Sequence, residues 1–237
     1  MNILLLGYGK MGKTIEQIAI DRGHSIVGKI DGPADSREGY NSENTDVAIE
    51  FSQPSAAVEN IKWCLEQKIP VVSGTTGWLD QFEEIKALCE ANGSAMFYAS
   101  NYSLGVNIFF RLNKYLARMM DHAEGYDVFM KEIHHLQKLD SPSGTAITLA
   151  EGIINHLKQK NSWKEGDSNE PNVLNIEALR EPDVPGTHSV TYESEEDRIE
   201  ITHTAHSRKG FALGAVLVAE WLPGKRGVQG MDDFLEF

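Results

Sequence analysis

Short apolar runs alternate with amphipathic segments over the first hundred residues of the chain. The runs have the length of strands, and the segments between them repeat apolar residues at the spacing of one helix face. Apolar strands that alternate with helices are typical of a parallel sheet covered on both faces. The predicted strands are Asn2–Leu6, Ser25–Ile30, Asp46–Phe51, Pro70–Ser73 and Ala95–Tyr98, and the predicted helices are Lys10–Arg22, Pro54–Gln67 and Leu79–Asn92.

The pattern changes after about Tyr102, where strands with alternating polar and apolar residues begin. Such alternation suits an antiparallel or mixed sheet with one solvated or interface face. The predicted strands are Tyr126–His134, Ile176–Leu179, His188–Glu193 and Arg198–His206, the predicted helices are Val106–Met120, Thr145–Lys158 and Phe211–Leu222, and Lys160–Pro171 is a predicted surface loop. We therefore expect an α/β chain with a first domain over 1–103, joined by about 211–237, and a second domain over 104–210.

Charge limits the classes of partner. Asp and Glu total 35 against 22 Lys and Arg, which gives a formal net charge of −13. Nucleic acids and anionic membranes attract a positive field, so we expect neither as a partner, and an anionic ligand needs a local positive site. We also expect no membrane span and no secretory signal, because no long apolar stretch and no basic leader is present.

The two cysteines, Cys64 and Cys89, lie in predicted helices without the spacing of metal ligands. Disulfides are rare in the reducing cytoplasm, where free thiols persist. We therefore expect a cytoplasmic protein with no metal. A zinc site on His134 and His135 lacks both ligand-type spacing and a third partner.

The segment Gly7-Tyr8-Gly9-Lys10-Met11-Gly12 is a GxGxxG directly after the first strand and at the start of a helix. One glycine makes the tight turn, one lets the backbone approach a pyrophosphate, and one permits close helix–strand packing. The helix start offers free N–H groups to the phosphates. Asp31 follows at the end of the second strand, at the spacing of an acid that binds the adenosine ribose. Together these features predict dinucleotide binding.

Asp31 also bears on the choice of cofactor. Its carboxylate repels the 2′-phosphate of NADPH, and Gly32 supplies no cation. Lys10, Lys13 or Lys29 could still reach that phosphate. The sequence therefore favours NADH and leaves NADPH open.

Two further segments follow predicted strands, at the edge where open parallel sheets bind ligands. Gly74-Thr75-Thr76-Gly77 follows the fourth strand, and Ala99-Ser100-Asn101-Tyr102 follows the fifth. Both are candidate walls of a nicotinamide pocket.

The residues from Glu132 to Ala146 hold the densest candidate chemistry. His134 and His135 end a predicted strand and should point to opposite faces. A histidine titrates near neutrality and can supply a proton, and Lys138 can bind a carboxylate. A single strand histidine is more often structural, but crowding of these groups beside a predicted dinucleotide domain favours an active site. His203, on an apolar face, is expected to be packed, and His206 is a weaker candidate.

A helix start follows in the same segment. Ser141 is the predicted N-cap and Pro142 the predicted first helical residue. Ser143, Gly144 and Thr145 would then present backbone N–H groups and a hydroxyl, which suits a carboxylate ligand.

Five segments give the chain a resemblance to the dihydrodipicolinate reductase family. They are GYGKMG, GTTG, ASNYSLGVN, EIHHLQKLDSPSGTA and EITHTAHSRKGFALGAV, and they span the whole chain. The EIHH segment is highly specific, whereas GYGKMG alone is not. The resemblance implies a Rossmann-type N-terminal domain, a smaller α/β C-terminal domain with a mixed sheet, and a homotetramer assembled through those sheets.

The resemblance also implies an activity. It is hydride transfer from NADH or NADPH to a small cyclic dicarboxylate in lysine and diaminopimelate biosynthesis. His134 matches the proton donor, Lys138 the second catalytic residue, and His135, Gly144 and Thr145 match substrate-binding positions. Gly7 to Gly12 match the pyrophosphate loop, Asp31 the ribose position, and Gly74–Thr76 and Ala99–Tyr102 the loops around the nicotinamide.

The chain departs from the family pattern in three places, one of which is the short segment between Asp31 and Asp46, on the adenine side of the predicted site. Many members have a basic residue after the ribose acid, where this chain has Gly32, and Arg180–His188 matches the family's glycine-rich stretch only loosely. Two other functions stay open: another Rossmann oxidoreductase that acts on a small carboxylic acid, and a non-catalytic NADH-sensing protein. A sensor would not need the His/Lys segment.

Overall fold

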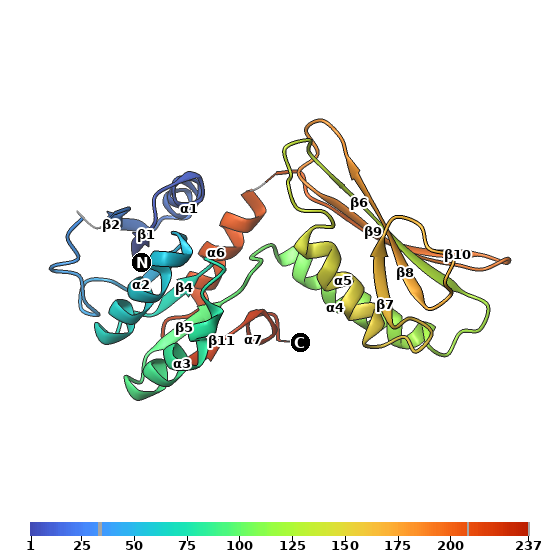
Figure 1. Cartoon of the computed structure of the whole chain (residues 1–237). Helices are drawn as coiled ribbons and strands as arrows, with labels where there is room; N and C mark the ends of the chain where they lie inside the picture. Colours follow the sequence, from blue (N-terminus) through green and yellow to red (C-terminus); the bar gives the residue numbers. More distant parts are fainter. Residues whose placement is uncertain (33–34, 208, 237) are drawn as a thin grey trace. The chain divides into compact units, whose positions relative to one another are not determined.

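The computed structural model describes residues 1–32, 35–207 and 209–236, which form two compact units (Figure 1). Unit 1 comprises Met1–Leu104 and Lys209–Phe237, and unit 2 comprises Gly105–Arg208. Within the described ranges, no helix has both the length and the apolarity needed to cross a membrane.

Unit 1 is built on a six-stranded sheet in the order β11-β5-β4-β3-β1-β2, and all of its strand pairs are parallel. This confirms the predicted parallel sheet. The strands are β1 Asn2–Leu6, β2 Ser25–Ile30, β3 Val47–Glu50, β4 Val71–Ser73, β5 Ala95–Tyr98 and β11 Gly227–Gln229. The short edge strand β11 was not predicted, because its three residues contain a single apolar side chain, Val228.

Helices cover both faces of this sheet. They are α1 Lys10–Asp21, α2 Pro54–Glu66, η1 Leu79–Gln81, α3 Phe82–Ala91, α6 Lys209–Trp221 and α7 Met231–Phe234. Alternate residues of β1 serve the two layers: Ile3 and Leu5 lie in the core with α1 and α6, and Leu4 and Leu6 in the core with α2 and α3. Such a strand is apolar throughout because both of its faces are buried.

Unit 2 is a five-stranded mixed sheet in the order β10-β9-β6-β8-β7, as the alternating pattern predicted. β6 is parallel to β8 and antiparallel to β9, and helices α4 and α5 cover one face of the sheet (Figure 1). The elements are α4 Leu104–Met120, β6 Asp127–His134, α5 Gly144–Ile154, β7 Ser162–Glu165, β8 Val173–Arg180, β9 Thr187–Glu193 and β10 Arg198–Thr204.

The prediction of a surface loop over Lys160–Pro171 is wrong for Ser162–Glu165, which form the edge strand β7. Three of these four residues are exposed, and Trp163 is their one apolar side chain. An edge strand with so few buried residues leaves no alternating pattern in the sequence.

Candidate active site

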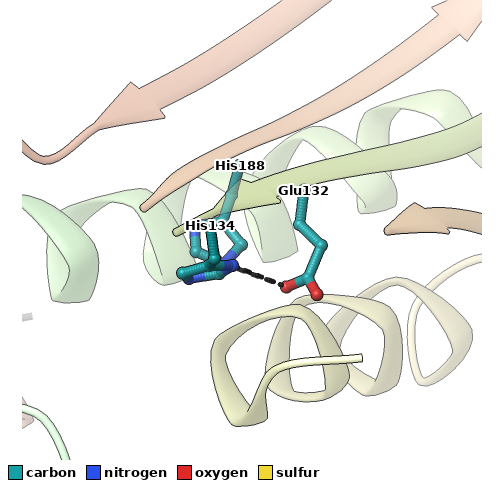
Figure 2. Close-up of side chains that lie close together, drawn as sticks. All are labelled: Glu132, His134 and His188. Carbon is teal, nitrogen blue, oxygen red and sulfur yellow. Dashed lines mark ion pairs between the residues drawn. The ribbon is translucent and has the colours of Figure 1, made fainter. Parts of the chain in front are cut away.

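Three titratable side chains meet at the carboxyl end of β6, on the face that α5 covers (Figure 2). Glu132 and His134 are two residues apart and therefore share a face of the strand. The antiparallel register of β6 and β9 places His188 opposite Glu132. Glu132 Oε2 lies 3.5 Å from His134 Nδ1 and 3.5 Å from His188 Nε2. All three side chains are buried, and Glu132 has no exposed surface.

Glu132 also holds the start of α5. The backbone N–H of Ser143 donates to both carboxylate oxygens, at 3.0 and 3.2 Å, and the Ser143 hydroxyl donates to Oε2. The Ser143 hydroxyl oxygen in turn accepts the N–H of Ala146, at 3.2 Å, and so caps the helix. One buried carboxylate therefore joins the strand end that bears His134 to the first turn of α5.

The predicted cap at this helix is wrong. Ser143 is the N-cap and Gly144 the first helical residue, whereas Ser141 and Pro142 precede the helix and are joined by a cis peptide bond. The hydroxyl of Ser141 instead donates to Glu165, at 2.6 Å. Serine is a favoured N-cap residue at both positions, and the long-range hydrogen bond to Glu132 makes Ser143 the N-cap.

Burial and hydrogen bonding set opposite protonation preferences in the cluster. Burial opposes the charge of Glu132, but hydrogen bonds from His188 and Ser143 outweigh burial and lower the pKa of Glu132 to about 2. Burial, together with repulsion from His188, lowers the pKa of His134 to about 4. At neutral pH the carboxylate is therefore ionised and the His134 imidazole is neutral.

The other predicted residues of this segment surround the cluster. Lys138 pairs with Asp140 inside its own loop, with Nζ 2.8 and 2.9 Å from the two carboxylate oxygens. His135 is half-buried just past the end of β6. Gly144 is exposed, and no atom lies within 4 Å of the position that a Cβ would take there. The start of α5 is thus open to an anion beside Thr145, which is half-buried.

Sequence reasoning assigned no role to Glu132, His188 or Arg180. The guanidinium of Arg180 lies 3.5 Å from Glu132 and donates to the carbonyl of Asp140, at 2.7 Å. Strand register brings these residues together from β6, β8 and β9, so no local pattern could reveal them. Gly186 is also fitted to the site, because a Cβ there would lie 3.0 Å from Nε2 of His134.

The two weaker histidine candidates lie elsewhere. His203 is half-buried on β10, its ring is 6.1 Å from that of Phe109, and burial lowers its pKa. His206 is exposed.

Glu132, His134 and His188 each offer one possible metal-ligand atom, and these atoms lie within 4.8 Å of one another. The Glu132 carboxylate already accepts the hydroxyl and N–H of Ser143, and Arg180 adds positive charge beside it. These contacts favour a hydrogen-bonded network over a metal centre. The expected absence of a metal stays a prediction.

In unit 1 the glycine loop has the shape that its spacing predicts. Gly7 has a φ of +94°, and a Cβ there would lie 2.1 Å from the carbonyl oxygen of Phe51. Gly12 packs on Gly7, since its Cβ would lie 2.4 Å from that residue's carbonyl oxygen. Gly9 is exposed, and α1 begins after it without a side-chain cap. The first turn of α1 therefore presents its N–H groups as a phosphate site requires.

The remaining residues of this predicted site are placed as follows. Tyr8 and Met11 are half-buried and Lys10 is exposed. The backbone N–H of Tyr8 donates to Asp31 Oδ1, at 2.6 Å, which fixes the acid at the end of β2 beside the loop.

Buried Glu50, at the end of β3, ties the candidate nicotinamide loops together. It accepts hydrogen bonds from the hydroxyls of Ser73 and Thr75, at 2.7 and 2.8 Å, and from the N–H of Ser52, at 3.0 Å. Tyr102 is buried, and its hydroxyl donates to the carbonyl of Ser73, at 2.7 Å. The side chains of Thr75 and Tyr102 therefore support the loops from within.

The other residues of these two loops are nearer the solvent. Thr76 and Ser100 are exposed, Gly74 and Asn101 are half-buried, and Ala99 is 9% exposed. Gly74 packs on Phe51, because a Cβ at that position would lie 2.2 Å from the aromatic ring. Thr76 and Ser100 are thus the side chains of these loops that a ligand can reach.

The fold has known counterparts among two-domain enzymes. An amine dehydrogenase from Mycobacterium smegmatis superimposes with a TM-score of 0.61 at 13% identity, covering 97% of this chain and 94% of the other. A dipicolinate-bound dihydrodipicolinate reductase from Paenisporosarcina sp. TG-14 superimposes with a TM-score of 0.80 at 21% identity, covering 99% of both chains. The nucleotide-type loop and the second α/β unit place the chain in the class of two-unit proteins with a Rossmann-type nucleotide-binding fold.

Sequence matches identify the particular family. The family model for the dihydrodipicolinate reductase N-terminus matches residues 1–102, and the model for the C-terminus matches 105–235. A 4-hydroxy-tetrahydrodipicolinate reductase of Christiangramia forsetii is 55% identical over 235 residues, which cover 99% of this chain and 98% of the relative. Its counterpart in Archaeoglobus fulgidus is 39% identical over 94% of this chain and 88% of the relative. The chain belongs to the dihydrodipicolinate reductase family, and it is a reductase with a nucleotide-binding N-terminal domain.

Proposed function

We propose that the protein reduces 4-hydroxy-tetrahydrodipicolinate to tetrahydrodipicolinate, in lysine and diaminopimelate biosynthesis. The reaction consumes one NAD(P)H and one proton and releases NAD(P)⁺ and water. The observation that best supports this proposal is the buried Glu132–His134–His188 cluster beside the open start of α5. It sets a proton-transfer group next to a site for anions, on a chain 55% identical to a reductase of that name.

In this proposal unit 1 binds the dinucleotide. The N–H groups at the start of α1 would hold the pyrophosphate, since Gly9 leaves that helix end open. Asp31 would bind the adenosine ribose, and the loops at 74–76 and 99–102 would line the nicotinamide. The cofactor supplies hydride, and the protein supplies position and charge. We infer a preference for NADH, because the carboxylate of Asp31 repels a 2′-phosphate.

Unit 2 would bind the substrate dicarboxylate. The first N–H groups of α5, at Gly144 and Thr145, donate to one carboxylate, and the hydroxyl of Ser143 stays with Glu132 to hold that helix in place. Lys138 binds the other carboxylate after it exchanges Asp140 for the substrate, with His135 beside it. Fixed positive groups on the carboxylates also make the ring more electrophilic.

His134 supplies the proton. In the free protein its pKa is about 4, so the imidazole is neutral at pH 7. A bound dianion favours the imidazolium and therefore raises this pKa towards neutrality. Glu132 adds attraction for the imidazolium and orients the ring through Nδ1.

We also propose a homotetramer that assembles through the sheets of unit 2. On β6 the side chains that point away from the buried cluster include Phe129, which is 37% exposed, and Ile133. Apolar residues on a sheet face without a helix cover suit burial against another subunit.

The test is a coupled assay in which the upstream synthase condenses aspartate semialdehyde with pyruvate and supplies the substrate. Loss of absorbance by NADH and NADPH is followed after the protein is added. Rapid oxidation that depends on both the synthase and this protein supports the proposal. Binding of NADH without turnover would instead support a sensor, and turnover only of other small acids would support a different oxidoreductase.

A further inference from the structure

Lys29, beside the glycine loop of unit 1, forms an ion pair with Glu16. Lys29, on β2, lies with its Nζ 2.6 Å from Glu16 Oε1 on α1. The same ammonium donates to the hydroxyl of Tyr8, at 3.1 Å, and lies 4.5 Å from the centre of that ring. The Tyr8 hydroxyl donates to the other oxygen of Glu16. Tyr8 of the glycine loop, Glu16 of α1 and Lys29 of β2 thus form one set in which each side chain contacts the other two.

The position of this set relates it to the adenosine ribose. Tyr8 belongs to the glycine loop, and its backbone N–H binds Asp31, the proposed ribose acid. Lys29 precedes Asp31 by two residues, near the end of β2. Lys10 and Lys13 are exposed on α1, and Lys13 Nζ lies 5.8 Å from the Tyr8 ring. Lys29 is therefore linked through Tyr8 to the acid at the ribose end of the site.

A second carboxylate lies beside Asp31. Asp35 Oδ2 accepts the backbone N–H groups of Asp31 and Gly32, at 2.7 and 3.1 Å. These N–H groups directly follow β2 and could otherwise donate hydrogen bonds to a phosphate on the ribose, but Asp35 already occupies them. The hydrogen bond from Lys29 lowers the pKa of Glu16, so the Glu16–Lys29 pair is fully charged at neutral pH and has no net charge.

We propose that Glu16 is a cofactor-selectivity residue: it holds Lys29 away from the 2′-phosphate position and so favours NADH over NADPH. This inference rests on the proposed nucleotide-binding function of unit 1. It assigns selectivity to a residue of α1, whereas the sequence pattern points to the acid that follows β2.

The test compares wild-type protein with Glu16→Gln, which removes the charge and keeps the shape. The readout is the NADPH to NADH ratio of kcat/KM, together with the ratio of dissociation constants from calorimetry. If Glu16 no longer holds Lys29, the lysine can bind the 2′-phosphate of NADPH, and both ratios should rise about 3-fold to 10-fold. In the double variant Glu16→Gln/Lys29→Met the gain should disappear, because the cation itself is absent.

Glu84→Gln is the matched control. Glu84 pairs with Lys62 in another Lys–Glu contact, and α2 and α3, which bear this pair, pack on the opposite face of the sheet from α1. Its ratios should equal those of the wild type.

Unchanged ratios in Glu16→Gln overturn the inference, and so does an equal rise in Glu84→Gln, which would mark a general effect of charge. Persistence of the gain without Lys29 also overturns it. A wild-type protein that binds neither nucleotide would overturn the proposed function and this inference with it, whereas tight NADH binding with unchanged ratios overturns the inference alone.

Discussion

Replacing Glu132 by glutamine tests whether one buried carboxylate organises both halves of the substrate site. The amide has nearly the same volume, so no cavity forms and the backbone of β6 keeps its register. It carries no charge, and one of its two ends donates hydrogen bonds instead of accepting them. That end would face groups that already donate, namely the N–H and hydroxyl of Ser143.

The magnitude follows from the contacts. The three hydrogen bonds from Ser143 change from charge-assisted to neutral, and the positive groups beside Glu132 lose their anion. Together these losses should lower the free energy of unfolding of unit 2 by roughly 3 kcal/mol. His134 also loses the group that faces its Nδ1 at 3.5 Å. A misplacement of the ring by about 1 Å should lower kcat/KM about 100-fold.

Hydrogen exchange localises the effect to one unit. Peptides that cover the first turn of α5, residues 143–150, should exchange faster in Glu132→Gln, because the cap on that turn is weakened. Peptides that cover the loop at residues 74–78 should not change. Denaturant unfolding supplies the stability, and steady-state kinetics supplies kcat and KM separately.

Glu50→Gln is the matched control, since Glu50 is equally buried and is also held by serine hydroxyls, but in unit 1. It should show the reverse pattern: faster exchange at 74–78, weaker NADH binding, and unchanged exchange at 143–150. A Glu132→Gln variant whose stability stays within about 0.5 kcal/mol and whose kcat/KM stays within about 2-fold of the wild type, both inside the ordinary effect of a neutral substitution, would refute the reasoning.

Three further predictions concern proton transfer and charge. ¹⁵N NMR of the His134 ring should give a pKa near 4 in the free protein and a value at least one unit higher with pyridine-2,6-dicarboxylate bound, because a dianion stabilises the imidazolium; an unmoved or lowered pKa would exclude the proposed acid role. In His134→Gln, kcat should fall far more than substrate binding weakens. Between pH 6.5 and 4 the unfolded wild-type chain binds the His134 proton while the folded chain does not, so the free energy of unfolding falls as the pH falls. This fall should be smaller in His134→Gln, which lacks the titrating group. Lys138→Ala should lower kcat and raise KM together, whereas Lys158→Ala, which removes an exposed lysine paired with Asp121, should change neither.

The fold could be predicted from the sequence where burial of a strand or helix produces a local pattern of apolar and polar residues. The strands of unit 1 are apolar runs because helices cover both of their faces, and β1 and β5 have the predicted bounds. The edge strands β7 and β11 were missed for the opposite reason, since their side chains are mostly exposed or half-buried. Helix starts were less certain, because Ser141 and Ser143 have the same intrinsic preference for a cap.

The site was predictable only in part. His134, Lys138 and the start of α5 lie within one segment, so their spacing indicates a common site. His188 and Arg180 reach that site through the register of β9 and β8 against β6, which depends on pairing across more than forty residues. The state of Lys29 was equally hidden, since its partner Glu16 lies on another element.

The assignment of both chain ends to unit 1 has a consequence for biosynthesis on the ribosome. The core that α6 forms with Ile3 and Leu5 contains Ala212, Ala215, Val216, Val218, Ala219 and Leu222. These side chains are translated after unit 2, so the part of one sheet face that α6 covers stays exposed while the whole of unit 2, a contiguous stretch, is already available to fold. The nascent protein should therefore acquire its second unit before its first, and a chaperone that binds exposed β-sheet should engage it until residue 222 has left the exit tunnel.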